Sequence, residues 1–155
     1  MPQPPVIAPT DLSVVDAIVA DAVELRRSVA ALQAQEARLL ASALTTVRAA
    51  SVGRPGSVEA ELPVRSLAAE LGAALRVSDR SVQRQLGEAV TLTERFPATF
   101  AALAAGRISR AHVTVIMDAG AHLTDPEARA VFEAAVLPYA EAESATRLKP
   151  VARLR

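Results

Sequence analysis

Cysteine is absent from this sequence of 155 residues, and aromatic residues make up only 3% of it. Without cysteine the chain has no disulfide, no thiolate metal site and no cysteine nucleophile, and a reducing, cytoplasmic location fits best. Lysine is also scarce, and Lys149 is the only lysine among the seventeen basic residues. Cysteine chemistry is therefore excluded, and arginine supplies almost all of the positive charge.

Long apolar runs are missing as well. No stretch of about 18 apolar residues occurs. A secretory signal has basic residues before an apolar core, and the proline-rich start, Met1–Thr10, has none. The sequence thus predicts neither a membrane span nor a secretory leader. Because the formal net charge is zero, any site for nucleic acid or an anionic surface has to be a local one.

Alanine, leucine and valine are abundant. Apolar residues make up 51% of the chain, and its six glycines and ten prolines leave long uninterrupted stretches of helix-forming residues. This composition predicts one all-α domain, a multi-helix bundle without a sheet. We expect a disordered, proline-rich lead-in over residues 1–11 and a helical domain over residues 12–155.

The longest helix is expected over residues 12–50, which contain neither glycine nor proline. Its apolar residues recur in alternating steps of three and four, interrupted by Glu36, and form a seam of the coiled-coil type. The seam consists of Val15, Ile18, Ala22, Leu25, Val29, Leu32, Leu39 and Ala43. Periodicity does not distinguish packing within the bundle from packing against a second copy. Burial within the bundle is the favoured interpretation, and a homodimer is the alternative.

Glycine and proline divide the rest of the chain. The sequence SVGRPG, residues 51–56, ends the long helix, and a core helical region is expected over residues 57–138. Helix starts are expected at Pro63, at Asp79, at Pro97, after Ser109, and at a capping box formed by Thr124 and Glu127. Pro138 is expected to end the last of these helices. A basic helix over residues 139–155 follows, and we expect it to lead to a C-terminal domain that is absent here.

The segment from Ser66 to Leu86 has the spacing of a helix-turn-helix, with Val77 in the turn and Ser78 as the cap of the second helix. Arginine and glutamine are side chains that read guanine and adenine in a major groove. The residues expected on the exposed side of the second helix are Arg80, Ser81, Gln83, Arg84 and Gln85. Because Arg76 occupies the turn position usually filled by glycine, an ordinary antiparallel helix pair is the alternative.

A second basic group lies near the C-terminus, where no acidic residue follows Glu143. Its members are Arg147, Lys149, Arg153 and Arg155. We predict that this group contacts DNA together with Arg80 and Arg84.

No catalytic residue, metal site or cofactor is predicted. His112 and His122 are ten residues apart on what reads as one helix, about 15 Å along its axis, which is too far for both rings to bind one ion. Asp118 and His122 have the spacing of a weak metal pair, but a solvated helix pair is the favoured interpretation. The sequence contains neither a GxSxG nucleophile elbow nor a glycine-rich phosphate loop.

The stretch from Leu62 to Pro138 resembles a known helical family, domain-of-unknown-function family 222. The resemblance rests on an ordered series of landmarks: an Ala-rich helix, the RVS turn, an Arg-bearing helix, FPATFAALAAGRIS, and a helix opened by LTDPE and closed by AAVLP. In that family the helical region typically precedes a C-terminal HNH nuclease domain in actinobacterial proteins. The resemblance implies that nuclease chemistry belongs to that partner domain, because this sequence supplies no ββα-metal site.

Three hypotheses for the function remain. The first, which we favour, is a non-catalytic domain that binds or positions DNA for the nuclease domain of an HNH endonuclease-type protein. The second is a helical dimerisation scaffold for the same protein, and the third is a stand-alone regulator that binds DNA. Under the first hypothesis, the expected partners are DNA and the nuclease domain.

Overall fold

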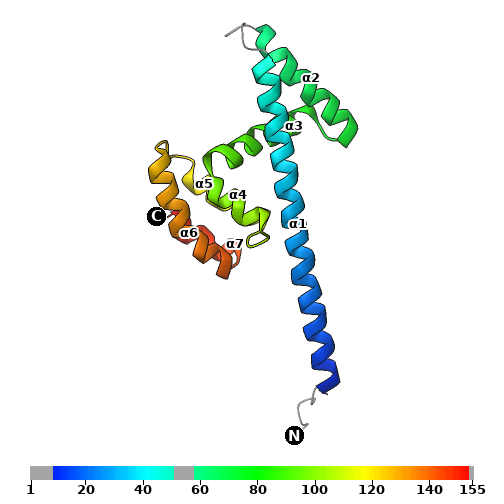
Figure 1. The fold of residues 1–155 in the computed structure, drawn as a ribbon, viewed down its shortest axis with the longest axis vertical. Coiled ribbons are helices and arrows are strands. Elements are labelled where there is room, and N and C mark those ends of the chain that lie inside the picture. The colour runs from blue at the N-terminus through cyan, green and yellow to red at the C-terminus, as the bar shows by residue number, and fades with distance from the viewer. Residues whose placement is uncertain (1–8, 51–57, 154–155) are drawn as a thin grey trace.

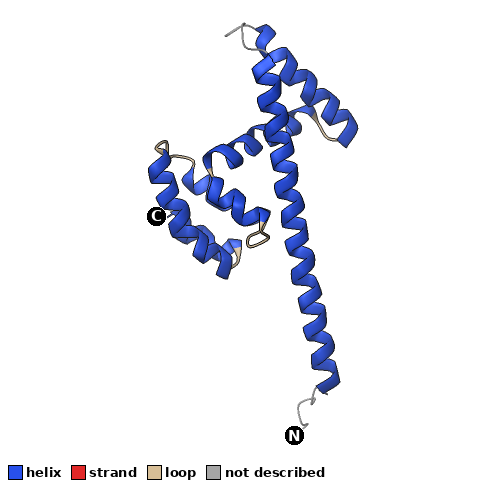
Figure 2. Ribbon diagram, viewed as in Figure 1, coloured by secondary structure: helices blue, strands red, loops and turns tan. Residues whose placement is uncertain are grey.

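The computed structural model describes residues 9–50 and 58–153. Within these residues every regular element is helical, with seven α-helices and one short π-helix (Figures 1 and 2). The prediction of an all-α fold with one long N-terminal helix is therefore confirmed. The predicted disorder of the lead-in falls on residues that lie mostly outside the described part, although the first helix already begins at Pro9.

The helices follow one another with short connections. They are α1 (Pro9–Ala50), α2 (Val58–Leu75), α3 (Asp79–Val90), η1 (Thr91–Arg95), α4 (Pro97–Ala104), α5 (Arg110–Gly120), α6 (Pro126–Ala142) and α7 (Ala145–Arg153). Figure 1 shows α1 as the long axis of the molecule, with α2 beside its C-terminal end and α4 to α7 grouped on one side. The N-terminal part of α1 extends beyond all the other helices.

Helix α1 packs against α3 and α4 mainly through alanine, with Leu44 as the one large apolar residue that is fully buried. Its buried face consists of Ala30, Ala34, Ala37, Ala41 and Leu44. In contrast, Leu25, Leu32 and Leu39 are 67%, 61% and 70% exposed. The expectation that the three-four seam is buried within the bundle is therefore wrong. Small side chains let the neighbouring helices approach the α1 backbone closely, so the alanine face is the one that the domain covers.

Two clusters of buried side chains hold the domain together. The larger lies among α1, η1 and α4 to α7, and its largest fully buried members are Phe96, Leu92, Leu103, Ile116 and Leu148. The smaller lies where α2 and α3 meet the C-terminal end of α1, and consists of Leu44, Ala68, Val82 and Leu86. This second cluster fixes the position of the α2–α3 pair.

Three local expectations about helix boundaries are wrong. Pro63 lies inside α2, which already begins at Val58. Pro138 does not end α6, which continues to Ala142 because the buried residues Val136 and Ala140 on either side hold it against the core. The N-cap of α6 is Asp125 and not Thr124, since the Asp125 carboxylate accepts a hydrogen bond from the Ala128 N–H at 2.9 Å.

No described helix combines the length and the apolar character that crossing a membrane would require.

Candidate nucleic-acid interface

The connection between α2 and α3 is a tight turn of three residues, Arg76, Val77 and Ser78. Arg76 has a φ of 57°, the left-handed conformation that glycine adopts most readily. The Val77 N–H donates a hydrogen bond to the Gly72 carbonyl at 3.0 Å, and the Ser78 hydroxyl caps α3 by accepting one from the Ser81 N–H at 3.2 Å. An arginine in the left-handed conformation thus occupies the position that glycine usually fills in a helix-turn-helix.

Glycine in the last turn of α2 allows the two helices to meet closely. A Cβ atom on Gly72 would lie 2.8 Å from Asp79 Oδ1 and 2.9 Å from the Val77 carbonyl oxygen. Both distances are shorter than real Cβ contacts, so a larger residue at this position would push the start of α3 away from α2. Below the turn, Val82 and Leu86 of α3 are fully buried, as the sequence pattern predicts.

One stripe of α3 is turned away from the core. Arg80, Gln83, Arg84 and Gly87 are all exposed and recur at helical spacing. The Arg84 Nε atom is 3.7 Å from a Glu88 carboxylate oxygen, whereas no ion-pair partner of Arg80 is found among the described residues. Three of the predicted contact residues are thus brought together on one surface.

Ser81 does not share this stripe. It is half-buried, and its hydroxyl accepts a hydrogen bond from the Gln85 side-chain amide at 3.4 Å. At about 100° per residue, Ser81 faces a different side of α3 from Arg80. Gln85 is half-buried as well. The prediction that Ser81 and Gln85 belong to the same exposed surface is therefore wrong.

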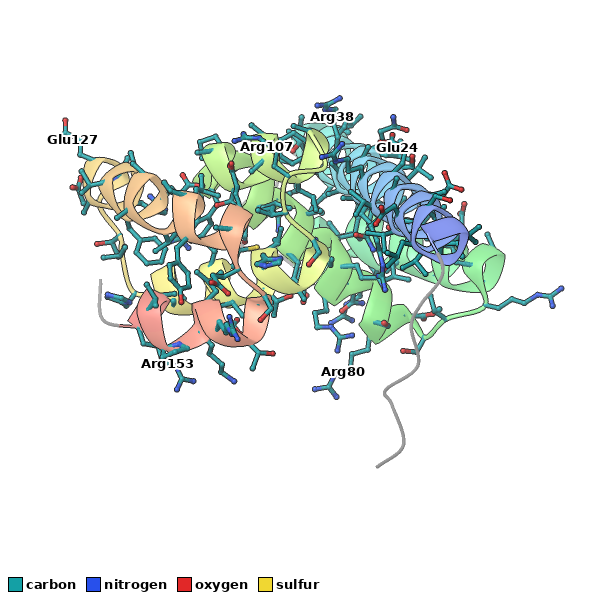
Figure 3. The ribbon with its side chains drawn as sticks, turned by 90° about the horizontal axis from the view of Figure 1, so that it is seen from below. Glu24, Arg38, Arg80, Arg107, Glu127 and Arg153 are labelled. Atoms are coloured by element: carbon teal, nitrogen blue, oxygen red, sulfur yellow. The ribbon has the colours of Figure 1, made fainter. Side chains whose placement is uncertain are left out.

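The second basic group lies on α7. Lys149 and Arg153 are exposed, while Leu148 and Ala152 are buried and attach this short helix to the core. Arg147 forms an ion pair with Glu143 at 3.0 Å, so part of its charge is neutralised. Arg155 lies outside the described residues. In Figure 3, Arg80 of α3 and Arg153 of α7 project from the same side of the domain.

Sequence reasoning missed Arg110, at the first position of α5. Its guanidinium is 2.9 Å from a Glu88 carboxylate oxygen and so connects α5 to α3. Glu88 therefore lies between two arginines, Arg84 and Arg110. The sequence carries no local signal for this link, because 22 residues separate the partners.

The family model for a domain of unknown function, DUF222, matches residues 26–154. The chain belongs to this family. The match runs from within α1 to the end of α7, and is wider than the stretch that carries the landmarks in the sequence. Comparisons with curated proteins and with solved structures find no match.

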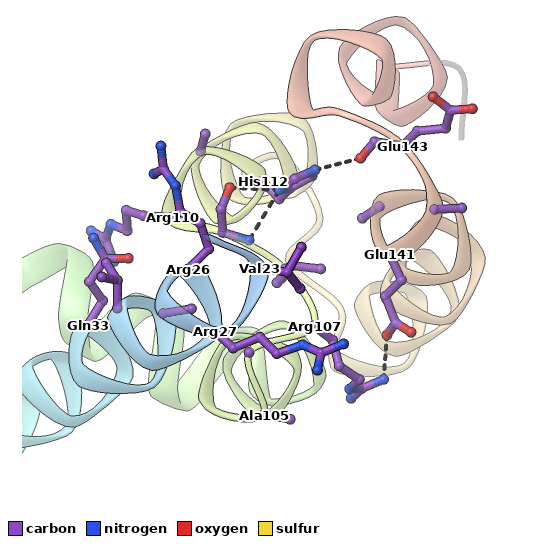
Figure 4. Close-up of a pocket in the computed structure, with 18 of the residues that line it drawn as sticks. Val23, Arg26, Arg27, Gln33, Ala105, Arg107, Arg110, His112, Glu141 and Glu143 are labelled. Atoms are coloured by element: carbon purple, nitrogen blue, oxygen red, sulfur yellow. Dashed lines mark hydrogen bonds and ion pairs between the residues drawn. The ribbon is translucent and has the colours of Figure 1, made fainter. Parts of the chain in front are cut away.

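This DUF222 domain has a cleft of about 870 Å³ between α1, the α4–α5 turn and the end of α6 (Figure 4). Arg26 and Arg27 line it from α1, and Arg107 and Arg110 line it from the turn and the start of α5. Arg107 forms an ion pair with Glu141 across one end of the cleft. Gly106, whose φ is +69°, brings the turn against α1, because a Cβ there would lie 2.9 Å from Arg27 Cβ.

Both ring nitrogens of His112 serve the fold of the DUF222 domain. Nδ1 is 2.8 Å from the Ser109 hydroxyl and 3.2 Å from the Ser109 nitrogen, and forms the capping box of α5. Nε2 is 2.8 Å from the Glu143 carbonyl oxygen and links α5 to the end of α6. His122 lies beyond the end of α5 and is exposed. Over residues 9–50 and 58–153, no group of three His, Cys, Asp or Glu side chains is placed to hold a metal ion.

Proposed function

We propose that this DUF222 domain binds duplex DNA through the exposed stripe of α3 and the basic side of α7. The observation that carries the proposal is the α2–α3 corner, where a three-residue turn leads into a helix that presents Arg80, Gln83 and Arg84 to solvent. In helix-turn-helix motifs the second helix enters the major groove with its N-terminal residues nearest the bases. Arg80 and Gln83 are in the first turn and a half of α3, where those contacts are made.

The other side chains of this surface suit contacts to phosphate. Arg153 projects from the same side of the domain as Arg80 (Figure 3), so a duplex lying across this side would meet positive charge at two separate places. Lys149 is exposed on α7 four residues before Arg153, a spacing that puts both residues on one face of the helix. Contacts to phosphate orient a protein on the duplex, and contacts to base edges supply sequence preference. We assign the first role to α7 and the second to α3.

Gly87 leaves one position of this surface without a side chain. It lies on the exposed stripe one turn after Arg84, and a Cβ at this position would meet nothing within 4 Å. A glycine inside a helix costs about 1 kcal/mol relative to alanine, and no contact within the domain requires it. A bare stretch of helix would let a sugar-phosphate backbone come close to α3.

The expected affinity is modest. The net charge of the chain is zero, and Glu88 offsets part of the charge of Arg84 and Arg110. In line with the family resemblance, we propose that the domain holds cytoplasmic DNA for an HNH nuclease domain joined to it, which supplies the cutting chemistry. Weak and salt-sensitive binding to DNA is sufficient for such a positioning role.

Fluorescence anisotropy with a labelled duplex, measured between about 50 and 200 mM salt, tests the proposal. With four to six phosphates neutralised, we expect log affinity to fall against log salt with a slope of about −4 to −5. Replacing Arg80 and Arg84 by alanine should reduce this slope by about two. The matched control replaces two exposed arginines elsewhere, Arg48 and Arg65, and should leave the slope unchanged.

Two results would count against this function. If the wild-type domain does not bind duplex DNA at about 50 mM salt, where non-specific contacts are strong, the domain is not a DNA-binding module. If Arg80→Ala with Arg84→Ala has no effect while Lys149→Ala with Arg153→Ala abolishes binding, only α7 contacts DNA and the helix-turn-helix assignment fails.

A further inference from the structure

Exposed large apolar residues are concentrated on one helix. Of the fourteen found among the described residues, ten belong to α1. They are Leu12, Val14, Val15, Ile18, Val19, Val23, Leu25, Val29, Leu32 and Leu39. Scattered apolar residues on a surface are normal, but so many large ones on a single helix indicate a contact surface.

Seven residues of α1 follow a heptad repeat. Val15, Ala22 and Val29 occupy the a positions, and Ile18, Leu25, Leu32 and Leu39 occupy the d positions. At about 100° per residue, the middle of this a/d seam lies about 120° around the helix from the buried face of α1. The rest of the domain therefore leaves the seam exposed from Val15 to Leu39, about 36 Å at 1.5 Å per residue.

The residue types on the seam favour a second copy of this chain as the occupant. In parallel coiled coils, valine at a with leucine at d favours two strands. Asp21 is at the g position of one heptad and Arg26 at the e position of the next, and these two positions meet across a parallel, in-register pair. Neither residue has an ion-pair partner among the described residues, so two such pairs would form, one on each side of a twofold axis.

We infer that two copies of this chain associate through the a/d seam of α1 as a parallel coiled coil. The interface runs from Val15 to Leu39 and leaves the alanine face of each α1 covered by its own domain. Glu36, at an a position, lies opposite its counterpart in the partner copy and weakens the C-terminal end of the interface. The inference does not depend on DNA binding, because α3 and α7 take no part in it.

Sedimentation velocity and equilibrium test the association. We expect wild type to sediment as a dimer and Leu25→Asp to sediment as a monomer, with a dissociation constant raised at least a hundredfold by a charge at a d position. Circular dichroism should show the mutant still folded, because Leu25 is 67% exposed within one chain. Ala20→Asp, an exposed residue at the f position of the same helix, is the matched control and should remain a dimer.

Cysteine crosslinking tests the orientation, since the chain has no cysteine of its own. Under mild oxidation Val15→Cys should form a covalent dimer, and the control Ala20→Cys should not. In an antiparallel pairing over the whole seam, Val15 would lie opposite Leu39, so the two Val15 positions would be about 36 Å apart and could not be joined. A wild-type monomer at about 100 μM, a dimer unaffected by Leu25→Asp, or the absence of crosslinking in a Val15→Cys dimer would each overturn the inference as stated.

Discussion

The carboxylate of Glu133 accepts two hydrogen bonds from Thr99, one from its backbone N–H at 2.7 Å and one from its hydroxyl at 2.6 Å. Both residues are buried, and 34 positions of sequence separate them. Thr99 is in the first turn of α4, where the N-cap residue, Phe96, has no oxygen in its side chain to satisfy a free N–H group. Helix α6 therefore caps α4 from a distance.

We expect Glu133→Ala to lower the free energy of unfolding by about 3 kcal/mol, because it leaves a buried N–H and a buried hydroxyl without an acceptor. Urea denaturation followed by circular dichroism measures this loss. Glu127→Ala, at an exposed carboxylate on the same helix, should cost less than about 1 kcal/mol. A similar small loss for both variants would show that the remote cap contributes little.

A substitution at the left-handed turn residue is expected to raise the free energy of unfolding. Arg76 has a φ of 57°, a conformation that costs a residue with a Cβ about 1–2 kcal/mol. We expect Arg76→Gly to raise the free energy of unfolding by about 1 kcal/mol. Arg76→Ala removes the same side chain but keeps the Cβ, so it should bring no gain. Equal stability of the two variants in thermal or chemical denaturation would refute the assigned strain.

Gly120, at the end of α5, is expected to tolerate no side chain. A Cβ there would lie 2.8 Å from a ring carbon of Phe96 and 2.9 Å from one of Phe132. Both rings are part of the larger core and are enclosed by other side chains. Gly120→Ala should therefore lower the free energy of unfolding by about 2 kcal/mol in a denaturation experiment, despite the better helix propensity of alanine. A stabilised variant would mean that the rings shift freely.

Gly87→Ala should raise stability and weaken DNA binding. Because a Cβ at Gly87 meets nothing within 4 Å, alanine should raise the free energy of unfolding by up to about 1 kcal/mol. If DNA approaches α3 at this point, the same change should weaken binding. Calorimetry and anisotropy on the one variant measure the two effects. Unchanged affinity in the stabilised variant would remove Gly87 from the proposed contact surface.

Local sequence signals predicted several helix ends correctly. Ser78 and Ser109 are N-caps, and Pro97 opens α4. These signals work because the groups that satisfy a helix terminus lie within a few residues of it. The same local periodicity predicted that Arg80, Gln83 and Arg84 share the exposed side of α3.

Contacts between segments far apart in the sequence could not be predicted from local signals in the same way. Both faces of α1 repeat at helical spacing, and the larger residues of the a/d seam outweigh the alanines in any measure of apolar character. The domain nevertheless covers the alanine face, because close approach of α3 and α4 depends on small size. The remote cap at Glu133 and the Arg110–Glu88 pair likewise join segments whose proximity arises only in the folded chain.

The uneven cover along α1 has a consequence for its motions. Every residue from Leu12 to Val29 is exposed, whereas buried positions recur from Ala30 to Leu44. A helical stretch of this length is marginal in water without packing, so its backbone amides should exchange with deuterium far faster than those near Ala34 or Ala41. Exchange in the first half of α1 should then slow as protein concentration rises, while exchange in the second half stays constant. One continuous helix thus contains a segment stabilised by its own domain and a segment whose helical order depends on contact with another molecule.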